Sequence, residues 1–247
     1  MQYKWNKFID TLIDKEGYKD VFEGLGNTAR IAIIGLLIGI VIGTVIAAIR
    51  VMPKRKWYAR LLNRVCGIYV GFFRGTPIVV QLLVGFFVIV PLLGVRVSEE
   101  DACVVIFGLN SGAYVSEIMR GGINSVDPGQ MEAGRALGLG YTVTLLKFIV
   151  PQAIKNILPT LGNEFISLIK ETSVISIVGA TDFCVAFKRM GENNYEVMVP
   201  YLVMAVCYII IVYAISLLIK LLEKIMAKNE RGKGGAGNAR SRKQAIA

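Results

Sequence analysis

The 247-residue chain is 54% hydrophobic and has a mean hydropathy of +0.57, which excludes a soluble domain of ordinary composition. Its formal net charge is +10, from 28 Lys and Arg residues against 18 Asp and Glu residues. In a soluble protein this balance would indicate nucleic-acid binding. Here the basic residues stand beside apolar segments, which indicates membrane orientation and contact with anionic lipid. The four cysteines are far apart without metal-ligand spacing, and the chain has no histidine, so we expect free thiols and no metal site.

Residues 1–26 form a polar leader that does not have the basic start and short apolar core of a signal peptide. Its apolar side chains follow helical spacing, which predicts an extracytoplasmic or interfacial amphipathic helix, although a solvated leader fits nearly as well. Gly24 to Ala29 match the G-x-G-x-x-A motif of dinucleotide-binding proteins in residue type and spacing, but not in structural context. No strand precedes them and an apolar segment follows, which excludes a nucleotide site.

Five apolar segments within residues 27–223 predict an all-α membrane protein with five transmembrane helices. We expect these spans at about residues 29–49, 78–93, 102–119, 154–169 and 197–222. The first span carries Gly35, Gly39, Gly43 and Ala47 at every fourth position. Such a ridge of small residues lets another helix approach closely, and the pattern leaves open whether that helix belongs to this chain or to a second copy.

The orientation is predicted by the basic residues that follow the first span. Between Arg50 and Arg74 there are seven basic residues and no acid, which predicts a cytoplasmic position, with the N-terminus outside and the C-terminus inside. Residues 57–73 within this block predict an interfacial helix. The loops at 94–101 and 181–196 are expected outside.

The tail at 224–247 is basic and of low complexity, which predicts a disordered cytoplasmic segment.

Polar side chains inside the apolar segments mark a possible transport path. The third span carries Asn110, Ser111, Ser116 and Glu117, and polar groups at membrane depth seldom face lipid. The fourth span has a polar stripe at steps of four, three, four and three residues, and it consists of Asn156, Thr160, Asn163, Ser167 and Lys170. This spacing puts all five on one helical face, which favours a wet or substrate-lined surface over packing alone.

We therefore predict a gate or substrate path along the fourth span and its end. Its candidate residues are Asn163, Glu164, Ser167, Lys170, Glu171, Thr172 and Ser173. A structural ion pair of Lys170 with Glu164 or Glu171 interprets these charges equally well. The apolar run 174–180 is too short for a span and is expected to fold back as a re-entrant piece.

Residues 125–151 contain the start and stop signals of two short helices with a hinge between them. Asp127 is a favourable N-cap, Pro128 fits the first helical position, and Gln130 can reach back as in a capping box. Gly138 and Gly140 suit a left-handed stop. A second helix is expected from Thr142 to Ile149, before Pro151 redirects the chain. A helical loop of this kind between membrane spans favours a docking site for another protein.

The same residues resemble the EAA loop of ABC importer permeases. Glu132-Ala133-Gly134, then Gly138, then Phe148-Ile149-Val150-Pro151 keep the spacing of that motif, with Gly134, Phe148 and Val150 as its three departures. Further segments resemble the polar amino acid uptake permeases of the histidine, glutamine and arginine branch. They are Arg74-Gly75-Thr76-Pro77, Gly112 to Ile118, Arg120 to Ile123, Pro151-Gln152-Ala153 and Lys170 to Ser173.

The resemblance implies a type I ABC importer permease fold in the inner (cytoplasmic) membrane, with cytoplasmic coupling helices. It implies two permease subunits, identical or different, two ATPase subunits docked on the EAA-like loops, and an extracytoplasmic binding protein that delivers a polar amino acid. The expected ATPase-docking residues are Gln130, Met131, Glu132, Ala133, Arg135, Ala136, Leu137 and Gly138, with Met131 and Leu137 as apolar anchors.

The chain has no phosphate-binding G-x-x-x-x-G-K-[ST] loop. We therefore expect no cofactor in this chain, with ATP and magnesium bound by the partner ATPase, and a non-catalytic role for the permease itself.

Two other classes of protein remain open on the sequence. An ion-coupled secondary transporter would use intramembrane acids such as Glu117 and Glu164, but five spans without an internal repeat fit that class poorly. An intramembrane enzyme or scaffold fits less well, because the sequence shows no metal cluster and no nucleophile with a base beside it.

Overall fold

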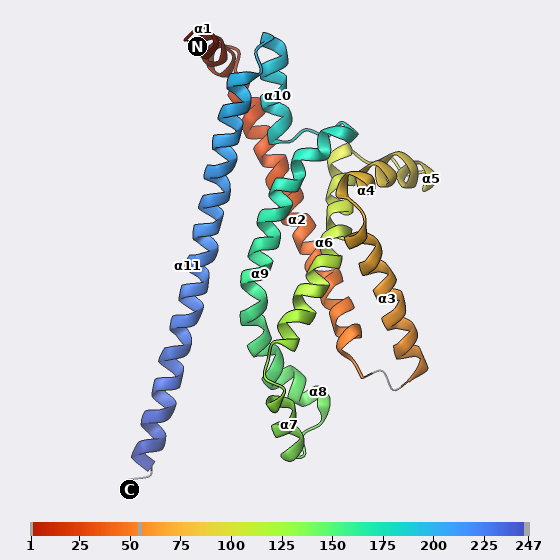
Figure 1. Ribbon diagram of the computed structural model, residues 1–247, viewed down its shortest axis with the longest axis vertical. Coiled ribbons are helices and arrows are strands. Elements are labelled where there is room, and N and C mark those ends of the chain that lie inside the picture. Colours follow the sequence, from red (N-terminus) through yellow and green to blue (C-terminus); the bar gives the residue numbers. More distant parts are fainter. Residues whose placement is uncertain (1, 54–55, 245–247) are drawn as a thin grey trace.

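The computed structural model describes residues 2–53 and 56–244, and within them every regular element is helical (Figure 1). The long helices are α2 (Gly17–Val51), α3 (Trp57–Gly75), α6 (Glu99–Asn124), α9 (Val150–Glu171) and α11 (Met198–Gln244). The short elements are α1 (Gln2–Ile9), η1 (Asp10–Asp14), α4 (Ile78–Val84), η2 (Gly85–Ile89), α5 (Val90–Leu92), α7 (Gly129–Ala136), α8 (Tyr141–Thr144), η3 (Leu145–Ile149), η4 (Thr172–Val178) and α10 (Phe183–Asn194).

The centre of the bundle is the pair α2 and α6, which lie against each other along most of their length (Figure 1). A Cβ at Gly39 would lie 2.6 Å from the Ser111 hydroxyl, and one at Gly43 would lie 2.7 Å from Val115. Both distances are shorter than a van der Waals contact, so only glycine allows this approach. The small-residue ridge of the first span therefore has its partner, α6, within this chain.

Membrane spans of the expected kind are present, but their limits differ from the sequence prediction. By length and apolar composition, α2, α6 and the part of α11 from Met198 to Ile225 qualify among the described residues. α3 and the segment Ile78–Leu92 qualify together as a pair bent by 106°. The expected fourth span, 154–169, lies within α9, which does not qualify because the polar stripe lowers its hydropathy.

The segment around Pro77 is arranged differently from the prediction. The expected interfacial helix 57–73 is the upright helix α3, which runs beside α2 and α6, while the expected span 78–93 turns away from it (Figure 1). The Tyr69 hydroxyl donates a 2.5 Å hydrogen bond to the Leu109 carbonyl and ties α3 to α6. Thr76 and Pro77 have extended backbones, which breaks the helix at this point.

The leader is helical, which is one of the two alternatives that the sequence left open, and the tail is helical where disorder was expected. α2 begins at Gly17, inside the expected leader 1–26, and its Gly24 lies so close to the Asp182 carbonyl that a Cβ would overlap it. Phe8 of α1 is buried against Phe183 and Met190, so the leader packs on the bundle. At the other end, the expected disordered tail continues α11 as a helix to Gln244; the segment contains no proline that would stop helix propagation.

Candidate functional site: the helical loop and the cavity beside α9

The loop between α6 and α9 lies at one end of the helix bundle, where α7 and α8 project beyond the ends of α2, α3 and α6 (Figure 1). Asp127 accepts a 2.7 Å hydrogen bond from the backbone N–H of Gly129 at the start of α7. Gly138 has φ +73°, a left-handed conformation that few other residues adopt. Gly138 ends α7 as the sequence predicts. The N-cap of α7 is Pro128 and not Asp127, without a side-chain cap hydrogen bond, so Asp127 and Pro128 each lie one position earlier relative to the helix than predicted.

The rest of this loop differs from the prediction in three further details. Gly140 has an extended backbone and precedes α8, so it is not part of a left-handed stop. The second helix begins at Tyr141 and continues through η3 into α9, with Pro151 at the start of α9. Gln130 makes no capping box; its side-chain oxygen accepts from Gln152 at 3.4 Å.

The predicted docking residues of α7 and its end are mostly exposed. The exposed ones are Gln130, Glu132, Ala133, Arg135, Ala136, Leu137 and Gly138. Leu137 has an exposed fraction of 78%, which is high for a leucine and is typical of a contact that a partner covers. Met131 is half-buried and packs on the cluster formed by Val126, Ile149 and Ala153. Of the two apolar anchors expected from the sequence, Leu137 faces outward and Met131 fixes the loop to its own chain.

The loop is attached to the long helices at two separate points, and one further contact joins its own two helices. The apolar cluster of Val126, Ile149, Ala153 and Ile157 joins it to α6 and α9. Gly134 of α7 lies against the buried Thr144 of α8, where a Cβ would meet the threonine side chain at 2.5 Å. The Tyr141 hydroxyl donates a 3.0 Å hydrogen bond to the carbonyl of Val51, at the end of α2. A force on α7 would therefore reach α2, α6 and α9 together.

A cavity lies where α9 and η4 face α10 and α11. Its volume is about 630 Å³, within the range of small-molecule sites. Lys170 and Ser173 line one side, and Tyr208, Tyr213 and Ser216 of α11 line the other. Two of the predicted path residues thus share one cavity.

Glu164 points away from that cavity. It accepts a 3.2 Å hydrogen bond from the Ser111 hydroxyl of α6. Arg74 and Glu171 are the charged groups that act on it electrostatically, and Arg74 also stacks over the Tyr114 ring at 5.3 Å. No ion pair joins Lys170 to Glu164 or Glu171 within the described part of the chain.

The remaining predicted path residues are divided between surface and core. Asn163 is exposed and Ser167 is half-buried. Thr172 is fully buried and donates a hydrogen bond from its hydroxyl to the Ile169 carbonyl at 2.8 Å, so it shapes the junction of α9 and η4. That 3₁₀ segment ends at Gly179, with φ +89°. The re-entrant course expected for 174–180 stays a prediction.

Sequence reasoning missed the α11 side of the cavity. Tyr208 and Ser216 are polar residues of an otherwise apolar span, and they are eight positions apart on one helical face. The same spacing argument that found the polar stripe of α9 could have found them.

The chain is a helical membrane bundle with a mostly apolar cavity between its helices, and Lys170 and Ser173 are among the polar residues that line it. An exposed helical loop lies at one end of the bundle. This arrangement is typical of a transport subunit. The chain belongs to the family described as binding-protein-dependent transport system inner membrane component, whose model matches residues 35–228. It is therefore a permease subunit of an ABC importer and a multi-pass component of the inner membrane, which confirms the assignment made from the EAA-like loop.

Curated relatives agree with this assignment. A putative glutamine transport system permease protein of Rickettsia conorii is 38% identical over 209 residues, covering 85% of this chain and 94% of that protein. The arginine transport system permease protein of Bacillus subtilis is 34% identical over 212 residues, covering 85% and 94%.

Solved structures have the same fold. A crystal structure titled as an amino acid ABC transporter with histidines superposes with a TM-score of 0.78 at 34% identity, covering 87% of this chain and 98% of that one. The inward-facing MetNI methionine ABC transporter superposes with a TM-score of 0.70 at 19% identity, covering 83% and 95%, and supports the fold alone.

Proposed function

We propose that this permease takes up a polar amino acid that an extracytoplasmic binding protein delivers, and that a separate ATPase subunit, which binds ATP and magnesium, drives the transport. The relatives named for glutamine and arginine support the substrate class. The chain has no phosphate-binding loop of its own, so it is the non-catalytic subunit. Family membership does not favour the alternative of an ion-coupled secondary transporter.

The proposed arrangement has five spans, with the N-terminus outside and the C-terminus in the cytoplasm. α9 serves as one of the five although it is polar, because it lies between α6 and α11 rather than alone in lipid (Figure 1). In this orientation α7 and α8 project into the cytoplasm, where an ATPase is accessible. The region around α10 then lies outside, where the binding protein delivers its substrate. A second permease subunit, identical or different, completes the membrane part.

The observation that carries the proposal is the combination of exposure and attachment in the loop. Leu137 and Glu132 are exposed on α7, while Tyr141 and Met131 tie the same loop to the long helices. Movement of docked ATPases would tilt α2, α6 and α9 and open the path to alternate sides of the membrane.

The substrate path is proposed to pass Lys170 and Ser173 in the cavity, with Glu164 and Glu171 as the acidic groups near it. An amino acid zwitterion needs an anionic and a cationic partner. Lys170 is exposed at the cavity wall and can supply the cation. Asn163 and Ser167 continue the polar face of α9.

The docking proposal is tested by Glu132→Lys in the assembled transporter. We expect this variant to lose co-purification of the ATPase and to lose ATP-driven uptake, because it reverses a charge in the middle of the exposed face. Glu192→Lys, an equal charge change on exposed α10 at the other end of the molecule, is the control and should keep ATPase binding. Unchanged ATPase binding and uptake in Glu132→Lys would show that α7 is not the docking site.

A second measurement addresses the source of energy. Vesicles that contain the permease without an ATPase should show no uptake under a proton or sodium gradient. Gradient-driven uptake in such vesicles would overturn the proposal and support the ion-coupled alternative.

A further inference from the structure

Two adjoining cavities lie where the ends of α2 and α6 meet the beginning of α3. One has a volume of about 280 Å³ and the other about 500 Å³, and both are lined by Arg50 and Asn63. Arg120 and Asn124 complete the first, and Arg60 and Arg64 complete the second. Every named side chain here is a hydrogen-bond donor, and four are permanently cationic.

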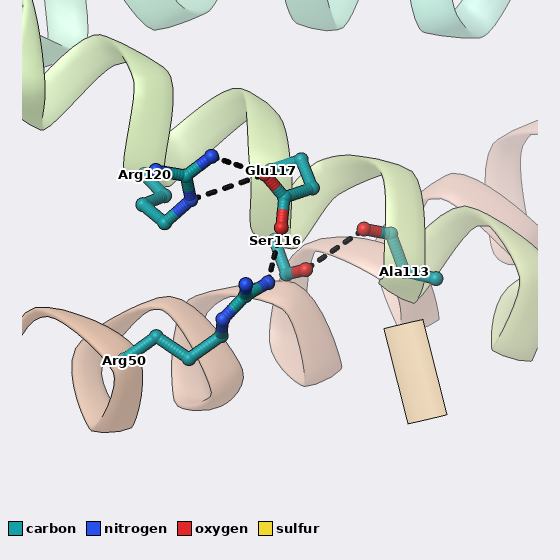
Figure 2. Close-up of polar contacts among 5 residues, drawn as sticks. All are labelled: Arg50, Ala113, Ser116, Glu117 and Arg120. Carbon is teal, nitrogen blue, oxygen red and sulfur yellow. Dashed lines mark hydrogen bonds and ion pairs between the residues drawn. The ribbon is translucent and has the colours of Figure 1, made fainter. Parts of the chain in front are cut away.

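The side chains around these two cavities carry more positive than negative charge. Figure 2 shows Arg50 and Arg120 beside the carboxylate of Glu117. Arg50 and Arg120 both donate to the carboxylate of Glu117, Arg50 to one oxygen and Arg120 to the other at 2.6 and 3.0 Å. The neighbouring Ser116 hydroxyl donates to the Ala113 carbonyl. One carboxylate thus serves two guanidinium groups, and no described carboxylate pairs with Arg60 or Arg64.

Helix stability does not explain all of these arginines. Arg50 lies in the last turn of α2, where the helix dipole favours a cation, whereas Arg120 lies before the last turn of α6. Arg60 and Arg64 lie in the first half of α3, whose first turn contains no acid. The dipole acts within the first turn only, so it opposes a cation at Arg60 and has little effect at Arg64. Neither exposed arginine is therefore stabilised by the dipole of its helix.

The surroundings of the cluster are those of a membrane surface. Trp57 and Tyr58 at the start of α3 are exposed, with Trp57 at 70%, and such aromatic residues are typical of the headgroup level. The next turns of the helix expose apolar side chains, among them Leu61, Val65 and Ile68. Ile68 also lines the larger cavity, so a molecule with a charged head and an apolar chain fits this place better than a free anion does.

We propose that this cluster, formed by Arg50, Arg60, Asn63, Arg64, Arg120 and Asn124, binds the headgroup of an anionic phospholipid. The guanidinium groups bind the phosphate oxygens in pairs of hydrogen bonds, and the acyl chains lie along the apolar face of α3. Val51, which lines the smaller cavity, accepts the Tyr141 hydrogen bond from the helical loop. The proposed lipid site therefore adjoins Val51, the residue through which α2 is joined to that loop.

The test measures lipid binding by native mass spectrometry of the full-length chain, with phosphatidylglycerol and phosphatidylcholine as the probes. Wild type should retain phosphatidylglycerol preferentially. The double variant Arg60→Gln with Arg64→Gln should lose about tenfold or more of that preference, because each basic group near an anionic headgroup contributes independently. The charge-retaining variant Arg60→Lys with Arg64→Lys should keep most of it, which separates loss of charge from misfolding.

The matched control is Lys220→Gln with Lys224→Gln, an equal loss of charge on α11, which should leave the preference unchanged. An equal loss in this control would overturn the proposal, since the effect would then depend on net charge alone. Binding of inorganic phosphate that is as tight as that of phosphatidylglycerol would also overturn it, by showing that the site takes a soluble anion.

Discussion

The Tyr141 hydroxyl donates a 3.0 Å hydrogen bond to the backbone carbonyl of Val51, and this bond joins two segments 90 residues apart. Val51 is the last residue of α2, where the terminal carbonyls have no partner within the helix. Burial raises the pKa of Tyr141, so the hydroxyl remains protonated at physiological pH and can donate. The first span and the coupling loop are thereby connected without a covalent link.

We expect Tyr141→Phe to reduce ATP-driven uptake by about fivefold or more, the size of a modest coupling free energy between two sites. The variant loses only the hydroxyl, so co-purification of the ATPase should be unchanged. Uptake into proteoliposomes, measured beside ATPase binding, checks both expectations. Tyr201→Phe removes a hydroxyl that has no hydrogen-bond partner among the described residues and should leave uptake unchanged; equal losses in the two variants would argue against a coupling role.

Gly134 departs from the EAA motif, and its contact with Thr144 gives the reason. A Cβ at position 134 would meet both the methyl and the hydroxyl of Thr144 at 2.5 Å. Gly134→Ala, which restores the motif, should therefore lower the free energy of unfolding by about 1–3 kcal/mol, as overpacking does in other cores. In a Thr144→Ala background the same substitution should cost much less, because the clashing atoms are absent.

Thermal unfolding of wild type, the two single variants and the double variant in detergent completes this double-mutant cycle. Gly121→Ala on α6 is the control, since a Cβ there meets no atom within 4 Å, and it should be neutral or slightly stabilising. A cost of Gly134→Ala that is the same with and without Thr144 would contradict the packing explanation.

Asp182 is a fully buried carboxylate at the start of α10. One of its oxygens accepts from the Val185 N–H at 2.8 Å, and the other has no hydrogen-bond partner among the described residues. Burial raises the pKa of Asp182 above its ordinary value. Between the unfolded and folded pKa values the folded state holds a proton that the unfolded state has lost, so stability falls as pH rises through this window.

Acidification from neutral pH towards pH 4 should therefore stabilise wild type relative to Asp182→Asn, whose side chain carries no charge at any pH. Asparagine keeps an oxygen for the Val185 bond, so the variant should fold and should be as stable as wild type, or more stable, at neutral pH. Melting temperatures in detergent across this pH range provide the measurement. A constant difference between the two proteins at every pH would show that Asp182 does not titrate in this window.

Much of the fold could be predicted from the sequence, because hydrophobic periodicity and the length of an apolar segment depend only on residues that are close in the chain. The EAA-like spacing identified the family, and the left-handed stop of α7 at Gly138 was predicted from local backbone chemistry. A helix at 57–73 and a separate span at 78–93 were also predicted, but the 106° bend between them was not. Its direction depends on the packing of α3 against α6, which local pattern does not contain.

The candidate site was predicted in part. The polar stripe of α9 was visible as spacing, but spacing does not tell which neighbour each residue meets. Only the fold directs Glu164 to Ser111 and Lys170 to the cavity beside Tyr208. In the same way, Met131 and Leu137 are equivalent as apolar residues in the sequence. Only the packing of the fold half-buries Met131 and leaves Leu137 exposed.

The sequence by itself determined the class of protein, the position of the coupling loop and the small-residue ridge of the first span. The tertiary structure decided that α6 fills that ridge and that Thr144 requires glycine at position 134. It also decided that Arg50 and Arg120 share one carboxylate while Arg60 and Arg64 line the adjoining cavity. The physical reason is the range of the interactions. Helix formation, capping and hydropathy act within a few residues, whereas close packing and charge clustering join residues that meet only when the chain has folded.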